Sequence, residues 1–383
     1  MDIYKKDKVM NKFNKLNLKG NPFRVTPSTN SSEIVWAGFG DIKNRISQRI
    51  IRAINIPNTS LILNWGEYGS GKTHALRYFC SPEVLKQLSE DNSMPYALDL
   101  RFPKSKEPVK EIFTQITDKL NIAKIRKDIE DNGVNIHKIL PEITDNIFMQ
   151  KVFSVMFEVQ STLFEKDPEG SEFKSFLYGT ADNKKYISKG ITRKLSNDND
   201  YIDFLAILFS ILTYGKKAYS CVILWIDEFE DISMLNTANI GNVNNLVRTL
   251  IDKCPNNLLM FLNLTLSAMI DVSDLGEYLQ EAVKSRIIDK IEFPIPSKEE
   301  LKEYLRALLN ADLYRLNKAL DENKYAPFND SVIDEVTHTL GDASLRKYNE
   351  VFSRLIESAA FDDVDCIDDE YFNRVKSEIM FLG

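Results

Sequence analysis

Residues 66–73 have the residue types and the spacing of a phosphate-binding loop. They read Gly-Glu-Tyr-Gly-Ser-Gly-Lys-Thr and fit the pattern G-x-x-x-x-G-K-S/T at every fixed position. The β-prone apolar run 59–65 precedes them, and a helix-forming run at 74–79 follows. The glycines let successive N–H groups point at one anion, and the positive end of the helix dipole adds to the attraction. We predict that nucleotide phosphates bind to a segment made of Gly66, Glu67, Tyr68, Gly69, Ser70, Gly71, Lys72, Thr73 and His74.

Two side chains of this loop have distinct expected tasks. Lys72 would reach the β- and γ-phosphates, and the hydroxyl of Thr73 would be a ligand of Mg²⁺. The alternative is a glycine-rich turn from strand to helix that carries Lys-Thr without any ligand. Because strand, loop and helix all agree with the motif, the sequence favours the phosphate loop.

An acidic pair follows the continuous apolar run 221–226, which predicts a central parallel strand covered on both faces. Carboxylates at the carboxyl end of such a strand lie where open α/β sheets bind their ligands. Asp227 would hold Mg²⁺ through water, and Glu228 would orient and polarise an attacking water. Acidic pairs after strands also arise by chance, but the loop at 66–73 favours the catalytic interpretation. The acidic residues at 230–231 receive no chemical role.

A third strong strand is predicted at residues 258–267. Its polar residues Asn263, Thr265 and Ser267 share one face by alternation. If this strand lies beside the one that ends at Asp227, either Thr265 or Asn263 would reach the γ-phosphate or the attacking water. The sequence does not choose between them, and an ordinary strand with one polar face is the alternative.

Composition limits what the rest of the chain can be. With 383 residues and 43% hydrophobic content, the chain can form two domains or one domain with a lid. Its net charge is −7 and its pI is near 5.3, so any contact with DNA would need a local basic patch. The four cysteines show no paired spacing, and three histidines give no zinc pattern. No apolar signal core or membrane-length apolar run occurs, so we expect a cytoplasmic protein that makes no membrane contact.

The chain divides into three regions, and the second contains an insertion. Residues 1–20 form a lysine-rich segment, expected to be a solvated tail, with a DNA-touching arm as the alternative. A domain with a parallel sheet is predicted at 21–296, and within it a mostly helical insertion at about 104–200. From a capping-box sequence at 297–300 onward the pattern is helical, which predicts a lid domain at 297–383.

Two shorter segments have competing interpretations. Residues Ile34, Val35 and Trp36 precede the first strand, and similarity to P-loop ATPases implies that they are candidates for contact with the adenine; plain core packing is the alternative. In the insertion, the segment 184–194 interleaves basic residues with Tyr186, which suits a nucleic-acid contact. A solvated loop is the favoured alternative for that segment.

Together, the loop, the acidic strand end, the polar strand and the helical lid resemble the AAA+ ATPases, particularly the Orc/Cdc6-like initiator branch, over roughly residues 21–383. The resemblance implies an α/β P-loop NTPase fold with a parallel sheet core, a helical insertion and a C-terminal α-helical lid. It also implies that Arg286 acts as an arginine finger in a neighbouring subunit's site. Arg346, in the Gly-Asp-Ala-Ser-Leu-Arg stretch, would contact the γ-phosphate of its own site. Each arginine has an ordinary surface role as its alternative.

A looser likeness also exists. The loop at 66–74, the stretch Phe-Leu-Tyr-Gly at 176–179 and the stretch Trp-Ile-Asp-Glu-Phe-Glu at 225–230 are similar to short motifs of ATP-binding proteins in BREX-type phage-defence systems. This likeness implies a role in antiviral defence.

The sequence therefore predicts an ATPase that binds ATP and Mg²⁺ at an interface between copies of itself. It would remodel or load a protein partner, such as an effector, nuclease, transposase or helicase, on DNA. The alternative is a slow-turnover switch that acts through protein partners without direct DNA binding. The preference for ATP over GTP rests on the resemblance alone.

Overall fold

The computed structural model describes residues 11–26, 28, 30–157, 170–180, 184–187, 189–254, 256–265, 278–317 and 324–380. These residues form two compact units. The first, which we call the loop unit, comprises Met1–Asn44, Gly66–Ser81 and Glu292–Gly383. The second, the sheet unit, comprises Arg45–Trp65 and Pro82–Ile291. None of the helices within the described ranges is long and apolar enough to cross a bilayer.

A five-stranded parallel sheet carries the order β2-β3-β4-β1-β5. Its strands are β1 (Thr59–Gly66), β2 (Tyr96–Arg101), β3 (Val222–Asp227), β4 (Leu258–Thr265) and β5 (Ile287–Phe293). Every residue of β3 except the last is buried, and the same holds for β4. Burial on both faces explains why these two strands read as continuous apolar runs. The predicted parallel sheet is confirmed, and β4 pairs directly with β3 as the placement of Asn263 requires.

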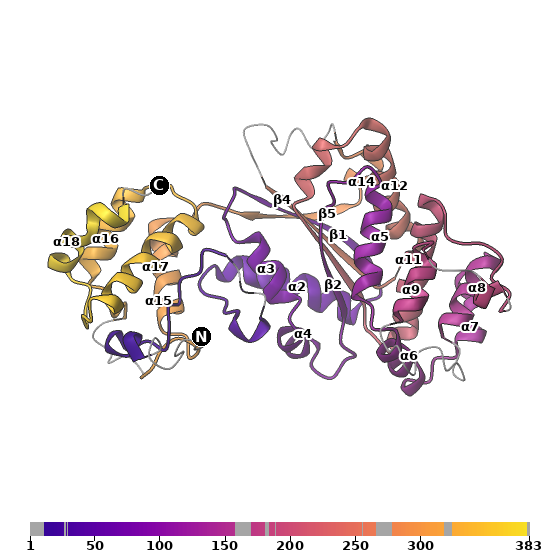
Figure 1. The fold of residues 1–383 in the computed structure, drawn as a ribbon, viewed down its shortest axis with the longest axis horizontal. Helices are drawn as coiled ribbons and strands as arrows, with labels where there is room; N and C mark the ends of the chain where they lie inside the picture. The colour runs from indigo at the N-terminus through magenta and orange to yellow at the C-terminus, as the bar shows by residue number, and fades with distance from the viewer. Residues whose placement is uncertain are drawn as a thin grey trace, which may run out of the picture. The chain divides into compact units, whose positions relative to one another are not determined.

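Helices cover the sheet and continue into the insertion. They are α4 (Pro82–Ser89), α5 (Pro108–Lys119), α6 (Ile122–Asp131), α7 (Ile136–Ile143), α8 (Ile147–Met156), α9 (Ser171–Leu177), α10 (Lys184–Ile187), α11 (Asp198–Leu212), α12 (Thr237–Lys253) and α14 (Glu281–Lys284). Short 3-10 helices also occur in this unit, η4 (Tyr214–Lys216) and η5 (Phe229–Met234). Helix α5 packs on β2 and against α11 and α12, as Figure 1 shows.

The insertion shares its core with the sheet. The ring of Phe204 on α11 lies 4.7 Å from Phe153 on α8 and 5.5 Å from Phe113 on α5, measured between centroids. Asparagine side chains cap α6, α7, α8 and α11 by accepting a hydrogen bond from a first-turn N–H. These caps let short helices follow one another closely.

Tyr186 does not contribute to a nucleic-acid contact, contrary to one interpretation of the sequence. Its side chain is 1% exposed, and its ring centroid lies 4.4 Å from that of Phe176. The nearby cations are also engaged, since Arg193 pairs with Asp200 and Lys194 Nζ donates to the carbonyl of Gly179. Tyr186 therefore belongs to the hydrophobic core, although its neighbours in the sequence are basic.

The Phe-Leu-Tyr-Gly stretch has a packing role within the insertion. Phe176 and Leu177 are fully buried on α9. Gly179 follows the helix with φ +77°, and its N–H donates to the carbonyl of Phe176, as in a glycine that ends a helix. Tyr178 donates its hydroxyl to Asp118, and burial together with this carboxylate raises the pKa of Tyr178.

The helices of the loop unit are α3 (Lys72–Phe79), α15 (Lys298–Leu309), α16 (Asp330–Leu340), α17 (Leu345–Phe361) and α18 (Asp369–Met380). The predicted capping box is present, because Ser297 and Glu300 exchange side-chain and backbone hydrogen bonds. Helix α2 (Gly40–Asn55) begins in this unit and ends in the sheet unit.

Residues 11–19 are not a solvated tail. Leu16 and Leu18 are at most 1% exposed and belong to the same hydrophobic core as α15 to α18. Lys15 pairs with Asp363 at 2.5 Å, and Lys19 Nζ donates to a backbone carbonyl at residue 312. The lysines of this segment suggest a solvated tail. The segment is nevertheless fixed by the buried Leu16 and Leu18, and its lysines bind partners some 300 residues away in the sequence. The lysines at positions 5, 6 and 8 lie outside the described residues.

Candidate nucleotide-binding site

The phosphate loop connects β1 to α3, and three glycines shape it for different reasons. Gly69 (φ +80°) and Gly71 (φ +103°) have left-handed backbone conformations that side chains disfavour. A Cβ at Gly66 would lie 2.3 Å from the carbonyl oxygen of Phe293, so only glycine fits there. A Cβ at Gly69 would lie 2.7 Å from the Cβ of Arg346, whereas one at Gly71 would meet nothing within 4 Å.

Lys72 points into the loop. Its side chain is 6% exposed, and Nζ donates to the carbonyls of Gly66 (2.9 Å) and Glu67 (2.8 Å) and to Ser70 Oγ (3.2 Å). The ammonium therefore sits inside a ring of backbone at the N-terminus of α3. A buried cation, left-handed glycines and a helix N-terminus together fit a nucleotide's phosphate groups.

His74 fastens the segment before the first strand to the loop helix. Its Nε2 lies 3.0 Å from the carbonyl oxygen of Val35, and burial lowers the pKa of His74. A neutral ring must carry its proton on Nε2 to donate in this bond. Trp36 packs beside it, with its ring centroid 5.3 Å from Tyr78 and 5.4 Å from Phe79. Val35 and Trp36 thus lie against α3.

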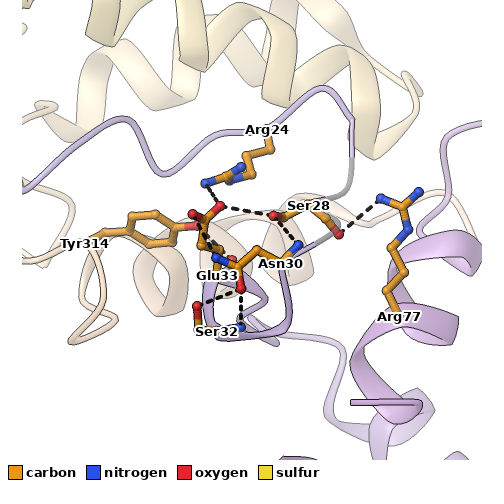
Figure 2. Close-up of polar contacts among 7 residues, drawn as sticks. All are labelled: Arg24, Ser28, Asn30, Ser32, Glu33, Arg77 and Tyr314. Carbon is orange, nitrogen blue, oxygen red and sulfur yellow. Dashed lines mark hydrogen bonds and ion pairs between the residues drawn. The ribbon is translucent and has the colours of Figure 1, made fainter. Parts of the chain in front are cut away.

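A polar network that the sequence did not reveal lies between residue 24 and α3, within the loop unit (Figure 2). Glu33 accepts from Arg24 (2.7 Å) and Ser28 Oγ (3.0 Å), and these contacts hold the pKa of Glu33 below its ordinary value. Arg77 of α3 donates to the carbonyl of Ser28 at 3.1 Å, and Tyr314 donates to the carbonyl of Glu33. The backbone carbonyls of Ser28 and Glu33 thereby fasten this loop to the phosphate-loop helix and to the helical part of the unit, while the Glu33 carboxylate holds the loop together. Asn30 and Ser32 complete the network.

Arg346 lies directly on the phosphate loop. Its backbone N–H donates to the carbonyl of Gly69 at 3.2 Å. Its Nη1 donates to the hydroxyl of Tyr68, and its guanidinium carbon lies 5.0 Å from the centre of the Tyr68 ring. The left-handed Gly69 permits this approach, because a side chain there would collide with Arg346. The structure therefore places the arginine that the resemblance singled out beside the residues expected to hold phosphates.

In the sheet unit, Asn263 is the centre of a buried polar chain. It is 0% exposed; its Oδ1 accepts from Trp225 Nε1 (2.7 Å) and Asn64 Nδ2 (2.9 Å). Its Nδ2 donates to Asp227 Oδ1 at 2.9 Å. Two donors into one oxygen fix the orientation of the amide, so its N–H groups must face Asp227. Of the two polar candidates on β4, Asn263 is the one that contacts Asp227, and its reach to a γ-phosphate stays a prediction.

Thr265 has a different partner. Its backbone N–H donates to Glu230 Oε2 at 3.0 Å, which ties the end of β4 to η5. This contact gives Glu230 a structural role that sequence analysis left unassigned. Ser267 lies outside the described residues.

Glu228 follows β3 in a left-handed conformation, with φ 57° and ψ 37°. Such a conformation is uncommon outside glycine and costs on the order of 1–3 kcal/mol. The carboxylate pairs with Arg101 at the end of β2, where the strand register sets Arg101 beside Asp227. Sequence analysis missed Arg101, although a basic residue at the end of a predicted strand was visible.

Arg286 is engaged within its own chain. Its Nε and Nη2 donate to Asp252 Oδ1 at 3.0 and 2.7 Å, and Nη1 donates to the carbonyl of Ala282. Its side chain is 30% exposed. Action in a neighbouring subunit would require this pair to open.

The predicted site residues thus form two sets. The loop residues 66–74 and Arg346 belong to the loop unit, while Asp227, Glu228 and Asn263 belong to the sheet unit. Arg346 contacts Tyr68 and Gly69 directly in the first set, and Asn263 donates to Asp227 in the second, while Glu228 pairs with Arg101.

A phosphate-type loop after β1, a carboxylate pair after β3 and a parallel sheet in this strand order define a P-loop α/β fold. More narrowly, the chain has the fold of the AAA+ ATPases, as comparison with solved structures shows.

Two of the similar structures are forms of the ORC2 protein of Aeropyrum pernix. The first, described as its ADPNP-ADP complexes, has a TM-score of 0.51 and 12% identity and covers 90% of this chain and 68% of that one. The ADP form has a TM-score of 0.51 and 14% identity and covers 93% and 72%. A Walker-type ATPase of Pyrococcus abyssi has a TM-score of 0.47 and 14% identity and covers 94% and 77%. No protein-family model matches the sequence, and no curated protein matches it either.

Proposed function

We propose that this chain binds ATP with Mg²⁺ on the loop 66–74 and hydrolyses it. The observation that carries the proposal is the buried ammonium of Lys72 inside a glycine loop at the N-terminus of α3. The nucleotides named for the ORC2 structures, ADPNP and ADP, agree with an adenine nucleotide.

Catalysis would rest on position and charge. Thr73 and Asp227 would hold the magnesium ion, which supplies positive charge to the phosphate oxygens when it is bound. Lys72 and Arg346 would bind the transferred phosphoryl group, and Glu228 would orient the attacking water. Arg286 would serve a neighbouring copy's site, which requires homo-oligomers. Trp36 and Val35 would contact the base, because they lie against α3.

The output we propose is the assembly or remodelling of a partner complex on DNA. Because Tyr186 is buried, the segment 184–194 does not supply an aromatic platform for DNA. Any DNA contact must therefore come from other basic groups. The Phe-Leu-Tyr-Gly stretch has a packing role, so the antiviral role rests on the motif likeness alone.

Steady-state hydrolysis tests the proposal. ATP turnover by the purified chain is measured across a protein concentration series, with and without duplex DNA, and Lys72→Ala is the blank. A rate per subunit that rises with protein concentration and again with DNA supports a shared site and a role on DNA. Turnover in Lys72→Ala equal to that of the unaltered chain would refute the assigned site.

One observation favours the second candidate, a slow-turnover switch that acts through protein partners. Two groups needed for hydrolysis are held by opposite charges of the same chain, Glu228 by Arg101 and Arg286 by Asp252. A flat, very low rate that DNA does not change, and that rises only with a protein partner, would support the switch.

A further inference from the structure

Tyr68 is an exposed aromatic residue of the phosphate loop, with 68% of its surface accessible. Exposed aromatic side chains in loops are seldom fixed by core packing, so their orientation depends on specific contacts. Here the contacts are with Arg346 at the start of α17, which stacks its guanidinium over the ring at 5.0 Å and donates Nη1 to the hydroxyl. One tyrosine therefore engages one arginine twice.

These contacts use only one edge of the guanidinium. Among the described residues, the Arg346 side chain has no hydrogen-bond partner other than the Tyr68 hydroxyl. Its Nε and Nη2 form the edge that binds phosphate oxygens in pairs. The tyrosine is uncharged, so the arginine keeps its full positive charge for a phosphate.

The backbone keeps the pair in place. The N–H of Arg346 donates to the carbonyl of Gly69, the residue next to Tyr68. The ring face and the hydroxyl thus set the direction of a side chain whose base is already fixed to the loop.

We infer that Tyr68 is a positioning residue, which orients Arg346 so that its free edge faces the γ-phosphate of a bound nucleoside triphosphate. The inference rests on the proposed function, because it assumes that phosphates bind to this loop. It predicts that Tyr68 acts on the third phosphate and only through Arg346.

The experiment measures the affinity of the full chain for a non-hydrolysable ATP analogue and for ADP, each with Mg²⁺, by titration calorimetry. We expect Tyr68→Ala to weaken analogue binding about five- to tenfold, from the sum of an exposed cation–π contact and one hydrogen bond, while ADP affinity changes less than about twofold. Tyr68→Phe, which keeps the ring, should lose about two- to threefold. In an Arg346→Ala background, Tyr68→Ala should have almost no further effect.

Phe361→Ala is the matched control. This ring is 75% exposed and holds the cation of Lys12 at 4.7 Å, at the opposite end of α17. Its removal should leave both affinities unchanged.

The two hypotheses fail differently. If Tyr68→Ala weakens ADP and the analogue equally, strengthens the analogue, or acts fully without Arg346, the positioning role is refuted while the nucleotide site stands. If the unaltered chain binds neither ligand, the proposed function itself is refuted.

Discussion

Replacement of Asn263 by leucine tests whether the buried polar chain holds the magnesium ligand. The change keeps the volume of the side chain but removes three hydrogen bonds. The Nε1–H of Trp225 and the amide of Asn64 would lose their shared acceptor, and both residues are 0% exposed. A buried group left unpaired costs about 1–3 kcal/mol, so the free energy of unfolding should fall by about 2–5 kcal/mol. That is a large share of the roughly 5–15 kcal/mol that stabilises an ordinary domain.

A matched control variant separates the functional effect of Asn263→Leu from its loss of stability. Asn244 is 1% exposed and also makes three hydrogen bonds, to the backbone at Ile240, Tyr278 and Gln280, but it does not contact Asp227. Asn244→Leu should therefore lower stability to a similar extent and leave the Mg²⁺ dependence of ATP turnover unchanged. Asn263→Leu should also raise the Mg²⁺ concentration needed for half-maximal turnover, because Asp227 loses the donor that orients it.

Urea denaturation and a magnesium titration of ATPase rate measure the two effects. A stability loss of less than about 1 kcal/mol for Asn263→Leu would refute the assignment of these hydrogen bonds. Equal magnesium dependence in the two variants would refute the role of Asn263 in orienting Asp227.

Three further outcomes are expected. Glu228→Gln should retain ATP binding and lower turnover by about 10²-fold or more, which a hydrolysis assay beside a binding titration would show; normal turnover would mean that another group directs the water. Gly69→Ala should weaken the ATP analogue more than ADP, because the new Cβ would collide with Arg346 at 2.7 Å; unchanged titrations would show that the loop tolerates the displacement. Tyr186→Ala should cost about 3–5 kcal/mol in urea denaturation with no effect on DNA binding; a selective loss of DNA affinity would restore the nucleic-acid interpretation.

Local patterns predicted most of the fold. The continuous apolar run that became β3 and the capping box at Ser297 were correct because strand burial and helix capping depend on neighbouring residues. The glycine loop between β1 and α3 was predicted for the same reason, because its motif lies in eight consecutive residues.

Errors and omissions arose where distant residues decide the outcome. The lysine-rich residues 11–19 suggested a solvated tail until Leu16 and Leu18 were found in the core of distant helices, and Tyr186 suggested exposure until its contact with Phe176 was known. The pairing of Arg101 with a residue at the end of β3 depends on strand order, which no local pattern states. The same limit applies to the pair that Arg286 makes with α12.

The charged residues of the candidate site differ in how they are neutralised, and this difference bears on mechanism. Glu228 and Arg286 each have a partner of opposite charge, while Arg346 rests on an uncharged tyrosine. Opposite-charge partners compete directly with the proposed catalysis, because they occupy the side-chain atoms that would meet water or phosphate. A tyrosine offers no such competition.

Under the proposed function, Arg346, which would bind phosphate, has no charged partner in the part of the chain that the structure describes, whereas Glu228 and Arg286, which would serve hydrolysis, are held by ion pairs. The restraint is weak, since the side chains of the Arg101 pair are 68% and 36% exposed, and exposed pairs contribute about 0–1 kcal/mol. A partner or a second copy that binds Arg101 or Asp252 could release Glu228 or Arg286 at little cost. Under the proposed function, this arrangement would separate nucleotide binding from hydrolysis, and the trigger for hydrolysis would be a charged surface outside the site.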